Sequence, residues 1–328
     1  MGDARETFLR GQLEQRRTRL ESALGQFGRP GQLVQLLQEV DSALERMDQG
    51  TYGLCEECHE SVEADRLMAD PLVRFCLDHL TSEEQRALEQ DLALASRIQG
   101  SLLPKRHLVQ DGWELYYHYE PLGPVSGDYV DVLTAGDDGG DLFFLLGDAV
   151  GKGVAASMLM AHLHATFRTL INLKLRVDQL VEQANRLFSE STLASFFATL
   201  VCGRASRSGE IELCNAGHCS PLLVRGGKVE SIEPTGLPIG LFSNSQYSAR
   251  RISLAKGETL FLFTDGLTEA RTHSSEEYGE SRVASLLARR HSLPPQALAE
   301  ACLDDVKAFL AGAPRMDDLT VMALRHAS

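Results

Sequence analysis

The sequence has no apolar run that approaches the roughly 20 residues of a membrane-spanning helix, and it starts with a charged stretch, MGDARETFLR. It also lacks any block of consecutive Lys and Arg. Acidic residues outnumber basic ones by 46 to 32, which gives a formal net charge of -14. Such a charge opposes binding to a phosphate backbone. We therefore expect a soluble, cytoplasmic protein with no membrane contact and no direct nucleic-acid binding.

Cysteine usage argues against a disulfide-stabilised protein. The seven cysteines are an odd number and no signal peptide is recognisable, so we expect a reducing compartment. Four of them are scattered through apolar or helical sequence and are expected to be buried thiols: Cys202, Cys214, Cys219 and Cys302. The remaining three lie close together and indicate a metal site.

These three, Cys55, Cys58 and Cys76, combine with His79 into two pairs, each with two intervening residues, and seventeen residues separate the pairs. This spacing is typical of two knuckles that close a tetrahedral structural zinc site. The alternative, three reduced surface cysteines and a stray histidine, does not explain why both pairs keep the same spacing. A closed site offers no position to a substrate, so we expect the zinc to serve folding and partner recognition.

Helical periodicity dominates the first hundred residues. Apolar positions recur at spacings of three, four and seven on both sides of a Gly- and Pro-containing break at 28–31, which predicts a helical hairpin over the first fifty residues. A further apolar stripe ends before Pro104 and predicts a linker helix: Leu88, Leu92, Ala95, Ile98 and Leu102. This helix is either a switch that transmits an orientation to the domain after it or a passive spacer.

After Pro104 the sequence changes to short β-rich runs with few helices between them. Strands are expected at 113–119, 142–146, 196–203, 211–214, 221–224, 259–263 and 319–324, and helices at 154–173, 177–188, 281–290 and 295–310. Neighbouring strands joined by turns favour antiparallel sheets, with the helices packed outside them in pairs. The fold class is therefore α+β. We divide the chain into a hairpin with a zinc finger over 1–80, a linker helix over 81–104 and a catalytic domain over 105–328.

Four acidic segments recur in this second half, and three of them adjoin an apolar strand: Gly127-Asp128, Gly147-Asp148, Thr264-Asp265-Gly266 and Met316-Asp317-Asp318. Carboxylates brought together cannot all ionise without a cation, and Mg²⁺ and Mn²⁺ prefer oxygen ligands. No convergent set of His and Cys in this half indicates zinc instead. Each segment alone reads equally well as an ordinary turn, but their joint occurrence and order favour a divalent-metal site.

Five ordered motifs then carry a family resemblance that runs from about residue 95 to the C-terminus: 124–131 (PVSGDYVD), 147–156 (GDAVGKGVAA), 215–218 (NAGH), 263–269 (FTDGLTE) and 317–321 (DDLTV). They resemble the SpoIIE/RsbU branch of the metal-dependent PPM-type serine/threonine phosphatases. The helix 95–104 is similar to the segment that precedes these catalytic domains. The resemblance implies a β-sandwich flanked by helix pairs, with two Mn²⁺ or Mg²⁺ ions at one edge of the sheets.

Carried over position by position, the resemblance implies that Asp148 bridges both ions and that the backbone carbonyl of Ala149 completes one coordination sphere. Asp265 and Asp317 would bind the other ion. Asp128 would hold the pair directly or through a water. A water activated by the two ions would then attack phosphorus in line, without a covalent phosphoenzyme.

Some positions remain open or depart from the family pattern. Asp318 is adjacent to Asp317 and is an alternative ligand. Ser126 stands where the family often has Gly, Val130 where it often has Tyr, and Val150 where it often has Ser, so loop shape and substrate contacts can differ. Lys152 either balances phosphate charge near the ions or is a solvated lysine at a helix start.

Competing motifs fail on their surroundings. Cys219 and Arg225 have the Cys-x5-Arg spacing of thiol phosphatases, but an apolar strand lies between them instead of a loop of amides. The segment 147–153 contains Gly-Lys-Gly without the spacing or the hydroxyl residue of a P-loop. His218 lies in the NAGH motif, where a structural and a catalytic role are both open.

The stretch that leads into the cysteines, 43–53, resembles the DksA/TraR zinc-finger family, and the resemblance covers about 40–80. That family usually ends its second knuckle in Cys, whereas this chain has His79. The resemblance implies a second class of function, a regulator of transcription that binds RNA polymerase through a helical hairpin. The bend at 25–31 lacks the acidic pair of that family's tip, which disfavours this alternative.

The phosphatase resemblance also implies a partner. The expected substrate is a phosphoserine or phosphothreonine of a regulatory protein, namely a STAS-type anti-sigma-factor antagonist. A homodimer formed through the N-terminal or linker helices is a further expectation. A catalytically inactive scaffold is disfavoured, because all the expected acids are present.

Overall fold

The computed structural model describes residues 2–27, 31–79, 82–134, 140–193 and 195–327. Its chain divides into two compact units, Met1–Asp91 and Leu92–Ser328. The expected linker helix corresponds to α4 (Ser82–Leu102), which begins in the first unit and ends in the second. The predicted break between the first two helices falls largely on 28–30, which lies outside the described residues.

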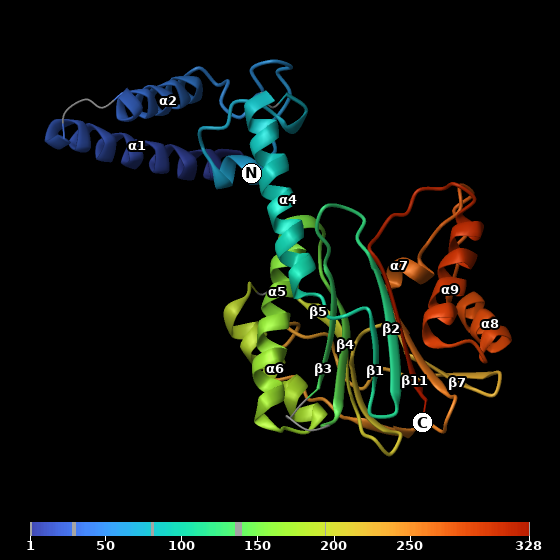
Figure 1. Cartoon of the computed structure of the whole chain (residues 1–328). Coiled ribbons are helices and arrows are strands. Elements are labelled where there is room, and N and C mark those ends of the chain that lie inside the picture. Colours follow the sequence, from blue (N-terminus) through green and yellow to red (C-terminus); the bar gives the residue numbers. More distant parts are fainter. Residues whose placement is uncertain (1, 28–30, 80–81, 135–139, 194, 328) are drawn as a thin grey trace. The chain divides into compact units, whose positions relative to one another are not determined.

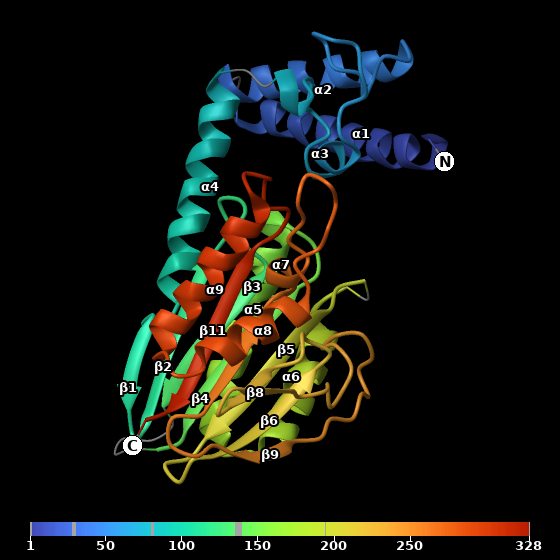
Figure 2. The ribbon, with the colours of Figure 1, turned by 90° about the vertical axis from the view of Figure 1, so that its right-hand side faces the viewer.

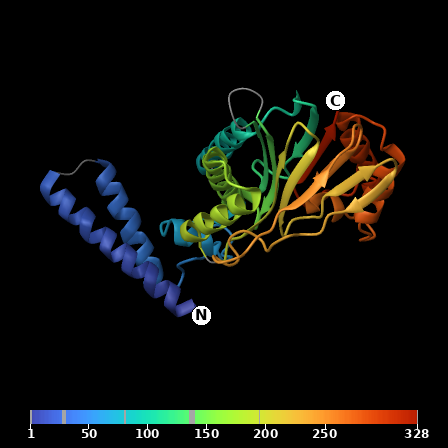
Figure 3. The same ribbon diagram turned by 90° about the horizontal axis from the view of Figure 1, so that it is seen from below.

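The first unit contains a helical hairpin of α1 (Gly2–Phe27) and α2 (Gly31–Asp48), which lie side by side (Figure 3). Both helices present an apolar face to the other because their apolar residues recur with helical spacing. The resulting core continues into the cysteine-rich segment and contains Leu9, Leu13, Leu20, Val40, Ala43, Leu44, Met47, Cys55, Val62, Leu67 and Cys76. The hairpin and the cysteine cluster therefore share one core.

The cysteine-rich segment carries only short helices, α3 (Ala64–Ala69) and η1 (Leu77–His79). Glu56 joins this segment to α2 through an ion pair with Arg46 at 3.1 Å. It also pairs with Arg74 from the same segment. With so little regular structure, the segment depends on this network and on the shared core for its shape.

The second unit is built on two antiparallel sheets. The six-stranded sheet has the order β1 (His107–Gln110), β2 (Trp113–Glu120), β11 (Leu319–His326), β10 (Thr259–Phe263), β7 (Leu222–Arg225) and β8 (Lys228–Ser231). The five-stranded sheet has the order β3 (Asp128–Thr134), β4 (Leu142–Ala149), β5 (Ala198–Ala205), β6 (Glu210–Ala216) and β9 (Arg250–Ser253). Strands adjacent in the chain are mostly adjacent in a sheet, although helices connect β4 to β5 and β10 to β11.

Strand β4 shows how the layers are formed. Side chains of a strand alternate between its faces, and here Leu142, Phe144 and Leu146 face the core between the two sheets. Phe143 and Leu145 face the core under the helices. A strand buried on both faces reads in sequence as an unbroken apolar run, which explains why this segment was predictable.

Helix pairs cover the outer faces of the two sheets (Figure 1). The five-stranded sheet packs against α5 (Gly153–Leu170), η2 (Ile171–Leu173) and α6 (Val177–Ser191). The six-stranded sheet packs against α8 (Glu280–Arg290) and α9 (Pro295–Leu310), which lie in front of it in Figure 2. The short α7 (Asp265–Thr268) follows β10 directly. This four-layer arrangement confirms the predicted α+β sandwich flanked by helix pairs.

The C-terminal end of α4 differs from the predicted apolar stripe. Leu102 packs against the core beneath α5 and α6, as the stripe requires. Ile98 does not follow the prediction, because it is 56% exposed. The buried position next to it is the polar residue Gln99, which is 7% exposed. Positions on one face of a helix are three or four residues apart, so the buried position after Ala95 can be residue 98 or residue 99. Only the packing in the folded protein shows that it is residue 99.

Candidate functional site

The predicted acidic residues lie where strands of both sheets end. Asp128 begins β3 and is directly opposite Asp148, near the end of β4. Asp265 follows β10, and Asp317 precedes β11. Because β10 and β11 are antiparallel neighbours, the end of one and the start of the other lie at the same edge of their sheet.

Asp128 joins the two sheets at this edge. Its side chain is 1% exposed, and its Oδ2 accepts hydrogen bonds from the hydroxyls of Thr264 (3.1 Å) and Thr320. Thr264 and Thr320 belong to the six-stranded sheet side, whereas Asp128 begins a strand of the other sheet. A buried carboxylate with two hydroxyl donors therefore holds the four acidic segments near one another.

Burial, and then the charges of neighbouring acids, disfavour ionisation of these carboxyl groups. Burial, followed by the charges of Asp265, Asp317 and Asp318, raises the pKa of Asp148 to about 7. Burial and the neighbouring Asp148 raise the pKa of Asp128 well above its usual range. Burial and nearby carboxylates also raise the pKa of Asp265. Buried carboxylates with acidic neighbours are stabilised either by a proton or by a bound cation.

Gly127 brings two predicted ligand oxygens into one small space. A Cβ atom at this glycine would lie 2.9 Å from the carbonyl oxygen of Ala149 and 3.2 Å from Oδ1 of Asp148. Both oxygens therefore face the Gly127 backbone, and any larger residue would collide with them. A carboxylate and a carbonyl oxygen side by side suit a hard cation such as Mg²⁺ or Mn²⁺.

The two adjacent acids before β11 have different surroundings. Asp318 accepts hydrogen bonds from the backbone N–H groups of Leu122 (2.6 Å) and Gly127 (3.0 Å), so both its oxygens bind the β2–β3 loop. Asp317 accepts hydrogen bonds from Lys152 Nζ at 2.8 Å and from the Asp318 N–H at 3.0 Å. Asp318 therefore holds the loop, whereas Asp317 contacts the exposed lysine. Lys152 contacts the site and is not merely solvated.

The acids are spread more widely than a single-ion cage. Among the described residues, no set of three carboxylates has its ligand atoms all within 4.8 Å of one another. The donors are all oxygens, and the residues present therefore fit a pair of Mg²⁺ or Mn²⁺ ions.

His218 lies behind the acidic site. Its Nδ1 is 2.8 Å from the hydroxyl of Thr199, which is directly opposite Asp148 on β5. Its backbone N–H donates to Asn215 Oδ1 at 2.8 Å, which closes the turn. Burial lowers the pKa of His218 to about 4. A neutral, buried imidazole in this position holds Thr199 on β5, next to Asp148 on β4. This contact favours the structural role of the two roles that the motif left open.

The thiol-phosphatase reading of Cys219 has no support. Burial raises the pKa of its thiol to about 12, whereas a nucleophilic cysteine needs a lowered pKa. Arg225 lies in β7 and pairs with Glu258 at 3.2 Å. Neither group is arranged to bind an oxyanion.

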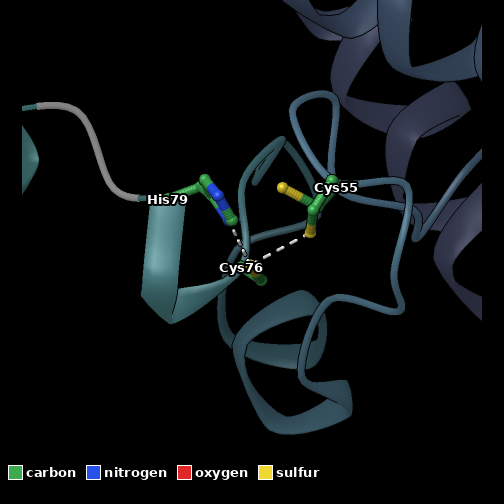
Figure 4. A group of neighbouring side chains, drawn as sticks. Cys55, Cys76 and His79 are labelled. Carbon is green, nitrogen blue, oxygen red and sulfur yellow. Dashed lines mark hydrogen bonds between the residues drawn. The ribbon is translucent and has the colours of Figure 1, made fainter.

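The four predicted zinc ligands come together in the first unit, and Figure 4 labels three of them, Cys55, Cys76 and His79. The ligand atoms of Cys55, Cys58, Cys76 and His79 all lie within 4.8 Å of one another. The Sγ atoms of Cys58 and Cys76 are 3.8 Å apart, and Cys76 Sγ is 3.2 Å from His79 Nδ1. Three thiols and one imidazole are the number and types of donor that a structural zinc ion binds in tetrahedral sites.

The backbone around Cys55 favours a thiolate. Burial opposes ionisation of this thiol, but backbone N–H groups of Cys58, Cys76 and Glu57 outweigh it and lower its pKa to about 6. Burial and the neighbouring thiols raise the pKa of Cys76 to about 11, so one thiol of the cluster ionises before the other. Zinc binds cysteine as the thiolate. The residues present therefore fit a structural zinc ion, with His79 as the fourth ligand.

Several residues shape the acidic site in ways that were not predicted from sequence. Thr264 and Thr320 hold Asp128, and Asp318, considered from sequence only as an alternative ligand, holds the β2–β3 loop. All three lie within the recognised motifs, and their position beside a strand end was the available signal. Gln99 contacts the same loop from α4, and its position in an amphipathic helix gave no indication of this contact.

Comparison with known proteins identifies both parts of the chain. The family model described as Stage II sporulation protein E (SpoIIE) matches residues 138–327. The model described as Prokaryotic dksA/traR C4-type zinc finger matches residues 50–78. The second match ends one residue before His79, the position where this chain has a histidine as its fourth candidate ligand.

Among curated relatives, Protein IcfG of Synechocystis is 25% identical over 263 residues, which is 71% of this chain and 41% of that protein. Phosphoserine phosphatase RsbU of Bacillus subtilis is 24% identical over 194 residues, which is 58% of this chain and 57% of that protein. The chain thus spans about half the length of these relatives.

In neither unit does a described helix have the length and apolar character needed to cross a membrane.

A solved structure gives the same fold. The SiaA-PP2C domain of Pseudomonas aeruginosa superposes with a TM-score of 0.65 at 21% sequence identity and covers 75% of this chain and 99% of that domain. Similarity at this level supports the arrangement of sheets and helices described above.

Proposed function

Since this chain belongs to the SpoIIE family, whose model matches more than half of it, we propose that it is a Mn²⁺- or Mg²⁺-dependent protein phosphatase that hydrolyses phosphoserine or phosphothreonine. The relative named phosphoserine phosphatase RsbU supports the reaction class. The observation that carries the proposal is the convergence of Asp128, Asp148 and Asp265 with raised pKa values at one edge of two sheets.

The residues have distinct tasks in this proposal. Asp148 and the carbonyl of Ala149 would hold one ion, and Asp148 would be shared with a second ion held by Asp265 and Asp317. Asp128, fixed by its two threonine hydroxyls, would complete the centre. When bound, such a pair of ions acidifies a water for in-line attack on phosphorus and neutralises phosphate charge.

Lys152 limits the negative charge at the open side of this site. Its Nζ donates to the Met316 carbonyl oxygen (2.7 Å) and to Asp317 (2.8 Å), and its side chain is 60% exposed. An exposed ammonium at this place can also attract a phosphorylated substrate. Its contribution to folding is small because solvent screens the ion pair.

The proposed substrate is a phosphorylated regulatory protein of the STAS-type anti-sigma-factor antagonist class, expected in the cytoplasm. Membership of the SpoIIE family and the similarity to RsbU support this partner. The first unit, with its closed donor set of three cysteines and one histidine, offers no open ligand position. We assign it to folding and to recognition of a partner.

The test of the proposed function is Mn²⁺-dependent hydrolysis of a phosphoserine peptide by the full chain. We expect Asp265→Asn to abolish hydrolysis, because it removes a charged ligand, and to leave the zinc content unchanged. Asp304→Asn, which changes an exposed acid of α9 outside the cluster, is the matched control and should retain activity. Full activity in Asp265→Asn would refute the site assignment.

The partner is identified by comparing phosphoproteomes of cells that carry the wild-type chain and an inactive variant. A single regulatory phosphoprotein that accumulates with the variant is the expected result. If the wild-type chain hydrolyses no phosphopeptide with either ion but binds RNA polymerase, the transcription-regulator alternative replaces the proposal.

A further inference from the structure

Gln99 is the only residue of α4 that is buried, among those of this helix whose side chains are described. Its amide makes two hydrogen bonds with one residue of the β2–β3 loop. Nε2 donates to the carbonyl oxygen of Ser126 at 2.7 Å, and Oε1 accepts from the Ser126 N–H at 3.0 Å. A primary amide can donate and accept at the same time, as a neighbouring β-strand would.

Ser126 has no substitute for this contact in the part of the chain that the structure describes. No other hydrogen-bond partner is recorded there for its N–H or its carbonyl oxygen. Ser126 is fully buried, so water does not compensate for a lost partner. Buried backbone groups without partners are costly, and the loop would have to move to find new ones.

The segment that Gln99 holds is in direct contact with the candidate metal ligands. The Ser126 hydroxyl accepts a hydrogen bond from the Asp128 N–H at 3.0 Å. The carbonyl oxygen of Gly127 accepts one from the Ala149 N–H at 3.1 Å. Gly127 is also the residue that faces Asp148 Oδ1 and the Ala149 carbonyl oxygen. Movement of Ser126 therefore moves the backbone that these oxygens pack against.

Asp318 holds the same loop from the opposite side. It accepts hydrogen bonds from Leu122 and Gly127 and directly precedes β11 of the six-stranded sheet, whereas Gln99 comes from a helix. The neighbouring strand β11 fixes the place of Asp318. Gln99 depends on the place of α4, and a shift of about 1 Å would lengthen its 2.7 Å bond beyond the range of a hydrogen bond.

We propose that Gln99 is a positioning residue, whose two hydrogen bonds to Ser126 hold the Ser126–Asp128 segment in the form that binds the ion ligated by Asp148 and Ala149. This inference rests on the metal centre of the proposed function. It assigns the link between α4 and the metal centre to one buried amide, not to the apolar stripe of the helix. The serine at position 126 takes part, because its hydroxyl continues the contact to Asp128.

The test compares Gln99→Met with Ile98→Ala in the full chain. Methionine has a similar length but cannot form either hydrogen bond, whereas Ile98 is the exposed neighbour on the same helix. Mn²⁺ affinity is measured by electron paramagnetic resonance of free Mn²⁺ during a titration. Backbone exchange is measured by mass spectrometry for peptides that cover 122–128 and, as an internal reference, 210–216 in β6.

We expect Gln99→Met to weaken Mn²⁺ binding by about tenfold, the effect of one or two lost buried hydrogen bonds. Exchange should be faster at 122–128 and unchanged at 210–216. Ile98→Ala should match the wild-type chain in both measurements. Phosphopeptide hydrolysis by Gln99→Met should return close to the wild-type rate at saturating Mn²⁺, because the ligands themselves are intact.

Two results would overturn the inference: Mn²⁺ affinity in Gln99→Met equal to wild type, or exchange that increases equally in both segments. The second would mean that Gln99 stabilises the whole unit and not the loop. Failure of the proposed function is recognised separately. In that case the wild-type chain itself would bind no Mn²⁺, before any variant is compared.

Discussion

Replacement of Asp148 by asparagine should stabilise the protein when Mn²⁺ and Mg²⁺ are absent. Burial and three neighbouring acids raise the pKa of this carboxyl from the 3.8 of an unperturbed aspartate to about 7. Above pH 7 the folded protein must hold an ionised carboxylate in unfavourable surroundings. Asparagine is nearly the same size and carries no charge, so Asp148→Asn removes this penalty.

The size of the effect follows from the pKa. A rise from 3.8 to about 7 corresponds to about 4 kcal/mol at 1.36 kcal/mol per pH unit. Asparagine must still be desolvated, and we therefore expect a gain of about 2 kcal/mol at pH 8. The carboxyl is protonated in both folded and unfolded chains below pH 3.8. The gain is thus complete above pH 7 and shrinks as the pH falls towards 4.

Mn²⁺ should reverse the order of stability. An ion that binds only the folded state at a concentration of 100 times its Kd adds about 2.7 kcal/mol. The wild-type chain should receive this stabilisation and Asp148→Asn should not, because the variant lacks the carboxylate that we propose as a ligand of both ions. The variant should accordingly be the more stable protein without Mn²⁺ and the less stable one with it.

Urea unfolding followed by tryptophan fluorescence measures both effects. The single tryptophan, Trp113, is 1% exposed in β2 and reports on the second unit. Curves are recorded at pH 8 and pH 5, with and without Mn²⁺, for wild type, Asp148→Asn and the control Asp304→Asn. If metal-free Asp148→Asn unfolds at a lower urea concentration than wild type at pH 8, the electrostatic reasoning is wrong. Retention of full Mn²⁺-dependent hydrolysis by this variant would refute its role as ligand.

Three further predictions concern separate parts of the molecule. A short exposure to EDTA should stop hydrolysis at once while zinc, detected with a chromogenic chelator, is released only under harsher conditions; simultaneous loss of both would contradict independent sites. His218 has a pKa of about 4 against 6.5 for a free imidazole, so its neutral form supports stability above pH 6.5 and this support is lost as the pH falls towards 4. Relative to His218→Gln, the wild-type chain should lose about 2 kcal/mol between pH 7.5 and pH 5 in urea unfolding, and parallel pH profiles would exclude this. Arg168→Met leaves the fully buried Asp131 without its bidentate partner and should lower the unfolding free energy by about 2 kcal/mol. The loss is moderate because Arg168 is 44% exposed and water partly screens the pair. The double variant Arg168→Met/Asp131→Asn should recover most of the loss, and an unchanged urea midpoint in Arg168→Met would show that the pair is unimportant.

Sequence reasoning identified the strands that have a continuous apolar run and missed β1, β3, β8 and β9. Strand β3 is mostly buried, but Asp128 and Asp131 interrupt its apolar pattern. The run in β4 is apolar throughout because the strand is buried on both faces. Strands β8 and β9 expose most of their residues, so they present no such pattern, and only pairing with β7 and β6 makes them strands. For the edges of a sheet, backbone pairing carries information that side-chain hydrophobicity does not.

In the candidate sites, too, some features could be predicted from sequence and others could not. The ordered acidic motifs and the spacing of Cys55, Cys58, Cys76 and His79 indicated both metal sites, because a metal requires certain ligand types at certain spacings. Sequence could not distinguish Asp317 from Asp318, since adjacent residues with the same side chain are equivalent until a backbone assigns their directions. In the structure Asp318 accepts hydrogen bonds from the amides of Leu122 and Gly127, whereas Asp317 accepts them from Lys152 and the Asp318 N–H.

The sequence by itself thus determined the chemistry of the protein: its family, its two kinds of metal donor and its α+β class, all of which depend on local pattern and residue type. Only the tertiary structure decided which groups act together. Gln99 and Ser126 are twenty-seven positions apart, and Thr320 and Asp128 are 192 apart. No periodicity connects residues so distant in the chain. Their contact arises because two sheets and a helix meet at one edge, where buried polar groups have to find partners.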